Sequence, residues 1–174
     1  ACKAKIVEAE NKLFKPIIGC EMYVARRTMD LKEGKPDQSG YHLIVLAKNE
    51  TGYHNLIKLV SHAWTRGYYM RPRTDRSELE KYHEGLICSA CLGGEVPKRI
   101  TAGQFAEAEE AIQWYKNLFG DDYYLELQRH KATVPRANHE CYPLQVNVNK
   151  HLIEYAKKFN VKLICTNDVH FVDE

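Results

Sequence analysis

The hydrophobic positions of the chain follow two patterns, one typical of strands and one typical of helices, which alternate along its length. Short segments that are apolar or that alternate, as buried strands do, lie at residues 16–25, 41–47, 85–91, 123–128 and 161–166. Apolar residues at three- and four-residue spacing predict amphipathic helices at residues 4–13, 51–63, 77–82, 101–119 and 146–159. This alternation of strands and helices predicts an α/β fold, an open sheet or a barrel with mostly parallel strands.

Length and composition indicate one soluble globular domain over residues 1–174. A formal net charge of +2 is too small to predict nucleic-acid binding from bulk charge, and it does not exclude DNA either. Six cysteines without a signal peptide favour the reducing cytoplasm over a disulfide framework. No apolar segment approaches the ~20 residues needed to cross a membrane. The chain begins without Met and inside a helical pattern, so we expect it to be part of a longer protein.

The clearest candidate for chemistry lies near the end of the chain, where an apolar strand stops at Asn-Asp-x-His. Asp168 and His170 are two residues apart, so on a strand their side chains point to the same side. A carboxylate and an imidazole are good ligands for zinc or manganese, and a strand end holds them rigidly. The alternative interpretation is that Asp168 caps a helix and His170 is an unrelated surface residue.

Three further residues of ligand type lie on or directly after predicted strands: Glu21, His42 and Cys91. A carboxylate inside a buried strand, such as Glu21, is costly unless it is paired or binds a metal. A lone histidine such as His42 is more often a core or surface residue. Cys88 and Cys91 form a CxxC, but on a strand their side chains face opposite ways, so at most one of them can join a given site.

Together these residues predict a polynuclear metal centre, because functional sites of α/β folds lie at the carboxyl ends of their strands. The sequence contains no glycine-rich phosphate loop, no GxSxG and no GxGxxG. Metal-assisted hydrolysis is therefore the leading chemistry. Glu126, Gln128 and His130 share one face of another strand, which is either a solvent-exposed face or the wall of a polar cavity.

Four segments in the same order carry a resemblance to a known family: KPIIGCE at 15–21, YHL with AKNETGY at 41–53, SACLGGE at 89–95 and TNDVH at 166–170. They resemble the polymerase and histidinol phosphatase (PHP) domain, in the version found at the N-terminus of bacterial DNA polymerase III alpha subunits. The resemblance covers essentially the whole chain. It implies a distorted (β/α)7-type barrel with up to three divalent metals, zinc or manganese, at its C-terminal face.

The family has nine metal ligands, and five of these positions match here: Glu21, His42, Cys91, Asp168 and His170. The other four belong to a His-x-His motif with a following acidic residue and to a Thr-Asp-His motif, both of which we expect before Ala1. The resemblance therefore implies a partial barrel whose first strands are missing. Cys91, Asp168 and His170 could still form a partial site.

For function, the resemblance implies a phosphoesterase or 3′–5′ exonuclease that assists proofreading, in which Asp168 and His170 act through a metal-bound water. The expected partners are DNA, the proofreading exonuclease subunit and the sliding clamp of a cytoplasmic replicase. Polymerase chemistry would reside in domains after Glu174. The alternative is a non-catalytic module that supports the polymerase core and docks the proofreading subunit. A phosphatase acting on small phosphate monoesters ranks below both.

Overall fold

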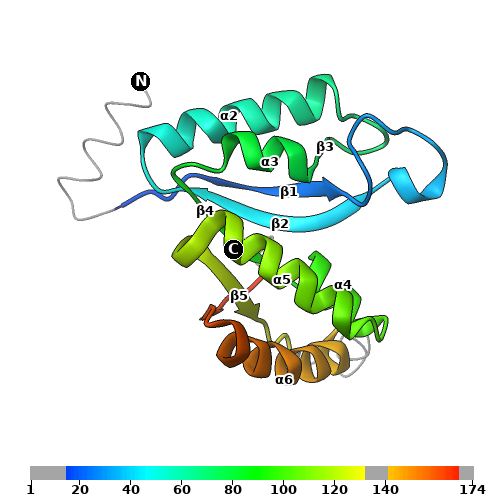
Figure 1. Cartoon of the computed structure of the whole chain (residues 1–174), viewed down its shortest axis with the longest axis vertical. Coiled ribbons are helices and arrows are strands. Elements are labelled where there is room, and N and C mark those ends of the chain that lie inside the picture. The colour runs from blue at the N-terminus through cyan, green and yellow to red at the C-terminus, as the bar shows by residue number, and fades with distance from the viewer. Residues whose placement is uncertain (1–14, 132–140, 169–174) are drawn as a thin grey trace, which may run out of the picture.

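A computed structural model describes residues 15–131 and 141–168 of the chain, so the predicted helix at 4–13 and the ligand candidate His170 lie outside the described residues. Six strands and five α-helices are present in this part (Figure 1). The strands are β1 (Gly19–Ala25), β2 (Gly40–Ala47), β3 (Arg73–Thr74), β4 (Leu86–Ala90), β5 (Tyr123–Leu127) and β6 (Lys162–Cys165). The helices are α2 (Glu50–Thr65), α3 (Arg76–Tyr82), α4 (Glu95–Thr101), α5 (Phe105–Phe119) and α6 (Tyr142–Phe159), with 3-10 turns η1 (Lys35–Asp37) and η2 (Gly120–Asp122). None of these helices has the length and apolar character that a membrane span requires.

The strands form one sheet in the order β3-β1-β2-β4-β5-β6. Three of its five strand pairs are parallel, which confirms the predicted mixed α/β fold with mostly parallel strands. The two pairs made by β2 are antiparallel. The strict alternation of strand and helix therefore fails between β1 and β2, which are joined by a loop that contains only η1.

The antiparallel pairing also corrects the interpretation of β1 as a strand buried on both faces. Its residues alternate in exposure, and the side chain of Glu21 is 39% exposed. Antiparallel strands commonly bury one face and leave the other to polar contacts, which is the pattern that β1 shows. Glu21 is thus not a carboxylate inserted into a hydrophobic core.

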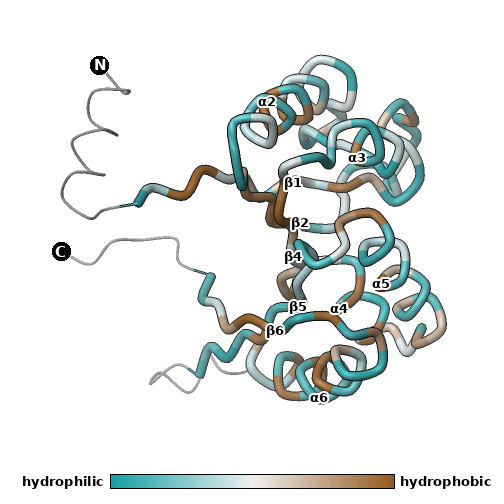
Figure 2. Tube along the Cα trace, turned by 60° about the vertical axis from the view of Figure 1, so that its left-hand side comes forward, coloured by the Kyte–Doolittle hydropathy of each residue, from teal (hydrophilic) through white to brown (hydrophobic). Residues whose placement is uncertain are grey.

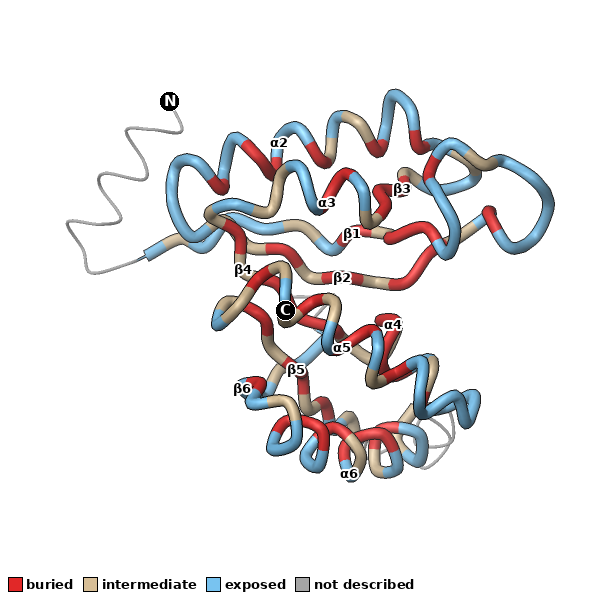
Figure 3. The backbone as a smooth tube through the Cα atoms, viewed as in Figure 1, coloured by how far each residue is buried: buried red, intermediate tan, exposed pale blue. Residues whose placement is uncertain are grey.

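The helices lie on one side of the sheet, as Figure 2 shows. Alternate strand residues point toward them and form the core, among them Val24, Leu43, Cys88 and Leu125. In Figure 3 the buried stretches of α2 and α6 lie on the side that faces the strands. Because strand side chains alternate, the residues between these core positions share the opposite face of the sheet.

Local signals explain two boundaries that differ from the prediction. The helix expected at 101–119 begins only at Phe105, because Gly103 adopts a positive φ of 72° between it and α4, a helix that the sequence did not predict. Helix α6 begins at Tyr142 rather than at 146, and Pro143 lies in its first turn, where a missing N–H is tolerated.

Candidate metal centre

The register of the sheet brings Glu21, His42 and Cys91 to the face away from the helices. Tyr23 of β1 lies opposite His42 of β2, so Glu21 is the diagonal neighbour of His42 on the same face. Ile44 pairs with Ser89, and continuing that register places Cys91, one residue beyond β4, opposite His42. The His42 N–H donates to the Gly93 carbonyl at 3.0 Å, which extends the pairing past the end of β4.

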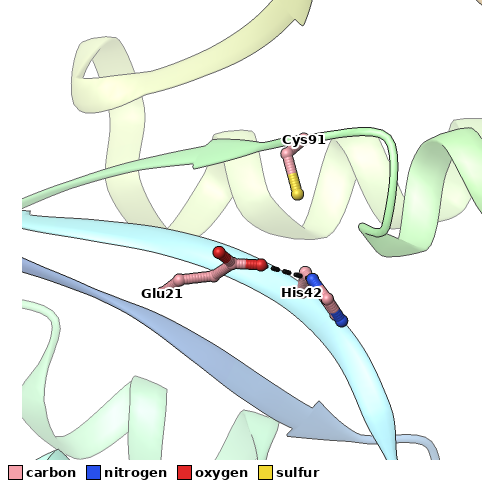
Figure 4. A group of neighbouring side chains, drawn as sticks. All are labelled: Glu21, His42 and Cys91. Carbon is pink, nitrogen blue, oxygen red and sulfur yellow. Dashed lines mark ion pairs between the residues drawn. The ribbon is translucent and has the colours of Figure 1, made fainter. Parts of the chain in front are cut away.

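These three side chains converge (Figure 4). One ligand atom from each, a carboxylate oxygen, an imidazole nitrogen and the thiol sulfur, lies within 4.8 Å of the other two. His42 Nδ1 and Glu21 Oε1 form an ion pair, and the Cys91 sulfur points toward this pair. Because β2 runs antiparallel, His42 reaches this edge from the start of its strand, so the rule that sites lie at the carboxyl ends of parallel strands does not account for its place.

Two neighbours hold the ring of His42 in place. Tyr23 packs edge-on against it, with ring centroids 5.0 Å apart and planes at 80°. A Cβ at Gly93 would lie 2.8 Å from the His42 Cγ, so only glycine leaves room for the ring. The absence of a side chain in the Gly93-Gly94 pair after β4 therefore leaves space for His42 at the site.

The electrostatic surroundings of Cys91 suit a cation. Burial raises the pKa of the Cys91 thiol to about 11; a hydrogen bond involving the Gly93 backbone opposes this shift, and the charges of Glu21, Glu126 and Asp168 reinforce it. A divalent cation would offset these carboxylates and favour the thiolate. Oxygen, nitrogen and sulfur donors at this mutual distance fit a zinc-type ligand set.

Asp168 lies beside the same three residues. Two cavities of about 220 and 230 Å³ open on this face, and Glu21, Cys91, Gln128 and Asp168 line both of them. Asp168 is exposed, and its backbone N–H lies 3.3 Å from His130 Nε2. The structure thus brings four of the five predicted ligands to one place; the fifth, His170, is outside the described residues.

The sequence left open whether Glu126 and Gln128 lie on a solvent-exposed face or on the wall of a polar cavity. Both residues line the smaller of the two cavities. Their face of β5 is therefore the wall of a polar cavity and not a solvent-exposed face. Glu126 is only 5% exposed and accepts hydrogen bonds from Ser89 Oγ and, at 2.6 Å, from Thr166 Oγ1. Gln128 Nε2 lies 3.4 Å from Glu126 Oε2 and 3.3 Å from Thr166 Oγ1.

His130 is held in place by a buried residue of α6 that the sequence did not single out. Gln145, 1% exposed, accepts from the His130 N–H at 2.7 Å and contacts His130 Nδ1 through its amide nitrogen at 2.9 Å. No local pattern marks Gln145, because its role depends on how α6 packs against the end of β5.

Lys98 of α4 is a second residue without a sequence signal. It is exposed and lines the larger cavity together with His42, Cys91 and Asp168. It is the only lysine or arginine that lines either cavity among the described residues. An isolated lysine in a charged helix has no pattern that distinguishes it from a solvated surface residue.

The two cysteines of the CxxC lie on opposite faces of the sheet, as their spacing predicts. Cys88 is fully buried in the core on the helix side, where burial raises the pKa of its thiol, whereas Cys91 faces the cavity. The two cysteines therefore do not form a joint site.

The fold and site together define a mixed α/β domain that carries a metal-type ligand cluster on the face of its sheet not covered by helices. The family model of the PHP domain matches residues 2–130. The chain therefore belongs to the PHP domain family.

Its curated relatives include the DNA polymerase III subunit alpha of Borreliella burgdorferi, 47% identical over 170 residues, which are 95% of this chain and 14% of that protein. The subunit alpha of Treponema pallidum is 43% identical, with 98% of this chain and 14% of the relative covered. That of Thermus aquaticus is 41% identical, with 91% and 12% covered. The chain thus spans about one seventh of the length of the curated relatives it matches.

Proposed function

We propose that the chain is the N-terminal PHP segment of a replicative DNA polymerase III alpha subunit, and that its site hydrolyses phosphodiester bonds as a 3′–5′ exonuclease. The proposed hydrolytic activity rests on one observation. One potential ligand atom of each of Glu21, His42 and Cys91 lies within 4.8 Å of the other two. The similarity to alpha subunits over at least nine-tenths of the chain supports the polymerase context.

In this proposal Glu21, His42, Cys91 and Asp168, with His170, hold divalent zinc or manganese, in up to three positions when the remaining ligands are present. A divalent metal held by these residues would supply Lewis acidity toward a phosphate and a water. Tyr23 and Gly93 keep the His42 ring at the cavity. Asp168 and His170 contribute to catalysis as ligands of the metal.

Lys98 is the residue we assign to the substrate phosphate. Lys98 lines a cavity that carboxylates also line, where a phosphodiester needs a cation to offset its charge. An exposed lysine such as Lys98 can contact the phosphate of a flexible single strand without reading its bases. The polymerase context makes DNA the proposed substrate, in a cytoplasmic replicase whose other partners are the proofreading subunit and the sliding clamp.

The test is metal-dependent excision by the full-length protein that carries this chain, with the separate proofreading subunit left out. We expect removal of a 3′-terminal nucleotide from labelled single-stranded DNA when Mn²⁺ or Zn²⁺ is added, and loss of that activity in Asp168→Ala and His42→Ala. The matched control is His54→Ala, an exposed histidine on α2 away from the cavities. Excision that both site variants retain would refute the catalytic proposal.

A second candidate is a structural module that supports the polymerase core of the same polypeptide. An exposed stripe on α2 favours it, because Tyr53, Ile57 and Trp64 present large apolar side chains at helical spacing. If the full-length protein lacks excision activity but Trp64→Ser lowers polymerase activity or stability, this candidate replaces the first.

A further inference from the structure

We propose that Glu126 is a positioning residue of the candidate metal centre, a buried carboxylate that ties together the strands bearing Cys91 and Asp168. This inference rests on the proposed function, because positioning has a purpose only if those residues bind a metal. It concerns a residue outside the predicted ligand set.

Glu126 lies at the middle of three neighbouring strands. Its Oε1 accepts from Ser89 Oγ of β4, and its Oε2 accepts from Thr166 Oγ1, directly after β6, at 2.6 Å. The carboxylate is 5% exposed, and among the described residues it forms no ion pair with a lysine, arginine or histidine. Its hydrogen-bond donors in the described part of the chain are the hydroxyls of Ser89 and Thr166 and the amide of Gln128.

Each hydroxyl partner of Glu126 lies two residues before a candidate ligand in the sequence. Ser89 precedes Cys91 by two residues, and Thr166 precedes Asp168 by two residues. Side chains two residues apart on an extended segment share a face and are separated by one repeat of the pleat. Glu126 therefore holds, through diagonal hydrogen bonds, the residues that precede Cys91 and Asp168 on the two neighbouring strands, and a shift of Ser89 or Thr166 would move the candidate ligand that follows it.

Glu126 is both a double hydrogen-bond acceptor and a buried carboxylate. Its two oxygens accept from Ser89 and from Thr166, which an amide with one acceptor oxygen could not do, although burying a carboxylate without a cationic partner is costly. Glu126 also lines the cavity of about 220 Å³ that Glu21, Cys91 and Asp168 share. Its negative charge therefore contributes to the field that attracts a cation to this cavity, while its hydrogen bonds hold the strands that carry the ligands.

The experiment compares Mn²⁺ affinity, the absorption spectrum of the Co²⁺ form and thermal stability in the full-length protein. Glu126→Gln keeps the size, removes the charge and replaces one of the two acceptor oxygens by an N–H donor. We expect a ten- to hundredfold loss of Mn²⁺ affinity, of the order found for residues that orient metal ligands, and an altered Co²⁺ spectrum. Glu78→Gln removes another buried carboxylate, 2% exposed on α3, and is expected to lower stability without changing affinity or spectrum.

Thr166→Val provides a second variant in case Glu126→Gln does not fold, because it removes one donor and leaves the carboxylate. It should also weaken Mn²⁺ binding. A folded Glu126→Gln protein with wild-type affinity and spectrum, or a Thr166→Val protein with both unchanged, overturns the inference while leaving the proposed function intact. Absence of metal binding by the wild-type protein overturns both.

Discussion

Gly93 and His42 are matched by shape: a Cβ on Gly93 would lie 2.8 Å from His42 Cγ and 2.9 Å from Nδ1. Gly93→Ala is therefore expected to displace the imidazole from the cavity. A displacement of about 1 Å can cost roughly a hundredfold in rate, so we predict at least a tenfold loss of metal-dependent excision. The measurement is the excision rate of the full-length variant on 3′-labelled DNA.

Gly103→Ala is the control for that prediction. Gly103 has a φ of 72° with nothing within 4 Å of its would-be Cβ, so alanine strains the backbone without touching the site. We expect it to lower stability by about 1 kcal/mol and to leave excision unchanged. Equal losses of excision in both variants would mean that Gly93 acts through stability alone.

Lys98 is expected to act on substrate and not on metal. Lys98→Ala should raise KM for single-stranded DNA about tenfold and leave the Mn²⁺ dissociation constant unchanged, whereas Lys98→Arg should restore most of the affinity for DNA. Lys157→Ala, an exposed lysine on α6, serves as the control. The assignment fails if Lys98→Ala changes neither KM nor the dependence of the rate on salt.

Gly52 marks the close approach of α2 to the loop before β4. A Cβ on Gly52 would lie 1.8 Å from the Gly85 carbonyl oxygen, at a helix start that Asn49 caps through a 2.9 Å bond from the Gly52 N–H. Gly52→Ala should destabilise the fold by about 1–3 kcal/mol through overpacking. Thr51→Ala, at the exposed neighbouring position, should change the free energy of unfolding by less than about 0.5 kcal/mol, and urea denaturation measures both.

Glu78 links stability to pH. Burial alone would raise the pKa of Glu78, but hydrogen bonds with His62 and Lys81 outweigh it, so that its pKa is lowered from the usual 4.5. A lowered pKa in the folded state means that the ionised group stabilises the fold above pH 4.5, and that this contribution is lost as the pH falls through the lowered value.

Glu78→Gln should therefore cost about 1.5–3 kcal/mol at pH 7 and flatten the fall of stability between pH 5 and 3. The control is Glu80→Gln, an exposed carboxylate on the same helix. If Glu78→Gln and wild type lose stability in parallel over this acid range, Glu78 is not the group responsible.

The site was predictable where residue type and strand position agree. Asp168 and Cys91 directly follow apolar strands, and both line the shared cavities. His42 was predicted for a partly wrong reason, because it enters from the start of an antiparallel strand. A pattern of apolar residues gives the strand but not its direction, since direction depends on pairing with β1 and β4.

The remaining contributors depend on contacts distant in sequence. Glu126 accepts hydrogen bonds from residues 37 and 40 positions away, and Gln145 holds His130 through the packing of α6. Gly93 lies in the SACLGGE segment and Lys98 carries no sequence signal, and only the fold places them against His42 and the cavity. The alternation of polar and apolar residues around Glu126 and Gln128 predicts a polar face of this strand. It does not predict the cavity, because residues of neighbouring strands form the rest of its wall.

The central claim is that Glu21, His42 and Cys91 bind a divalent metal, and a Co²⁺ titration of the full-length protein tests it most directly. Thiolate coordination gives Co²⁺ an intense near-ultraviolet absorption, so the band reports on cysteine ligation. We predict a saturable band that Cys91→Ser abolishes, that His42→Ala weakens, and that Cys165→Ser, an exposed cysteine on β6, leaves unchanged. A saturable band that survives Cys91→Ser, or no band in the wild-type protein, would contradict the account.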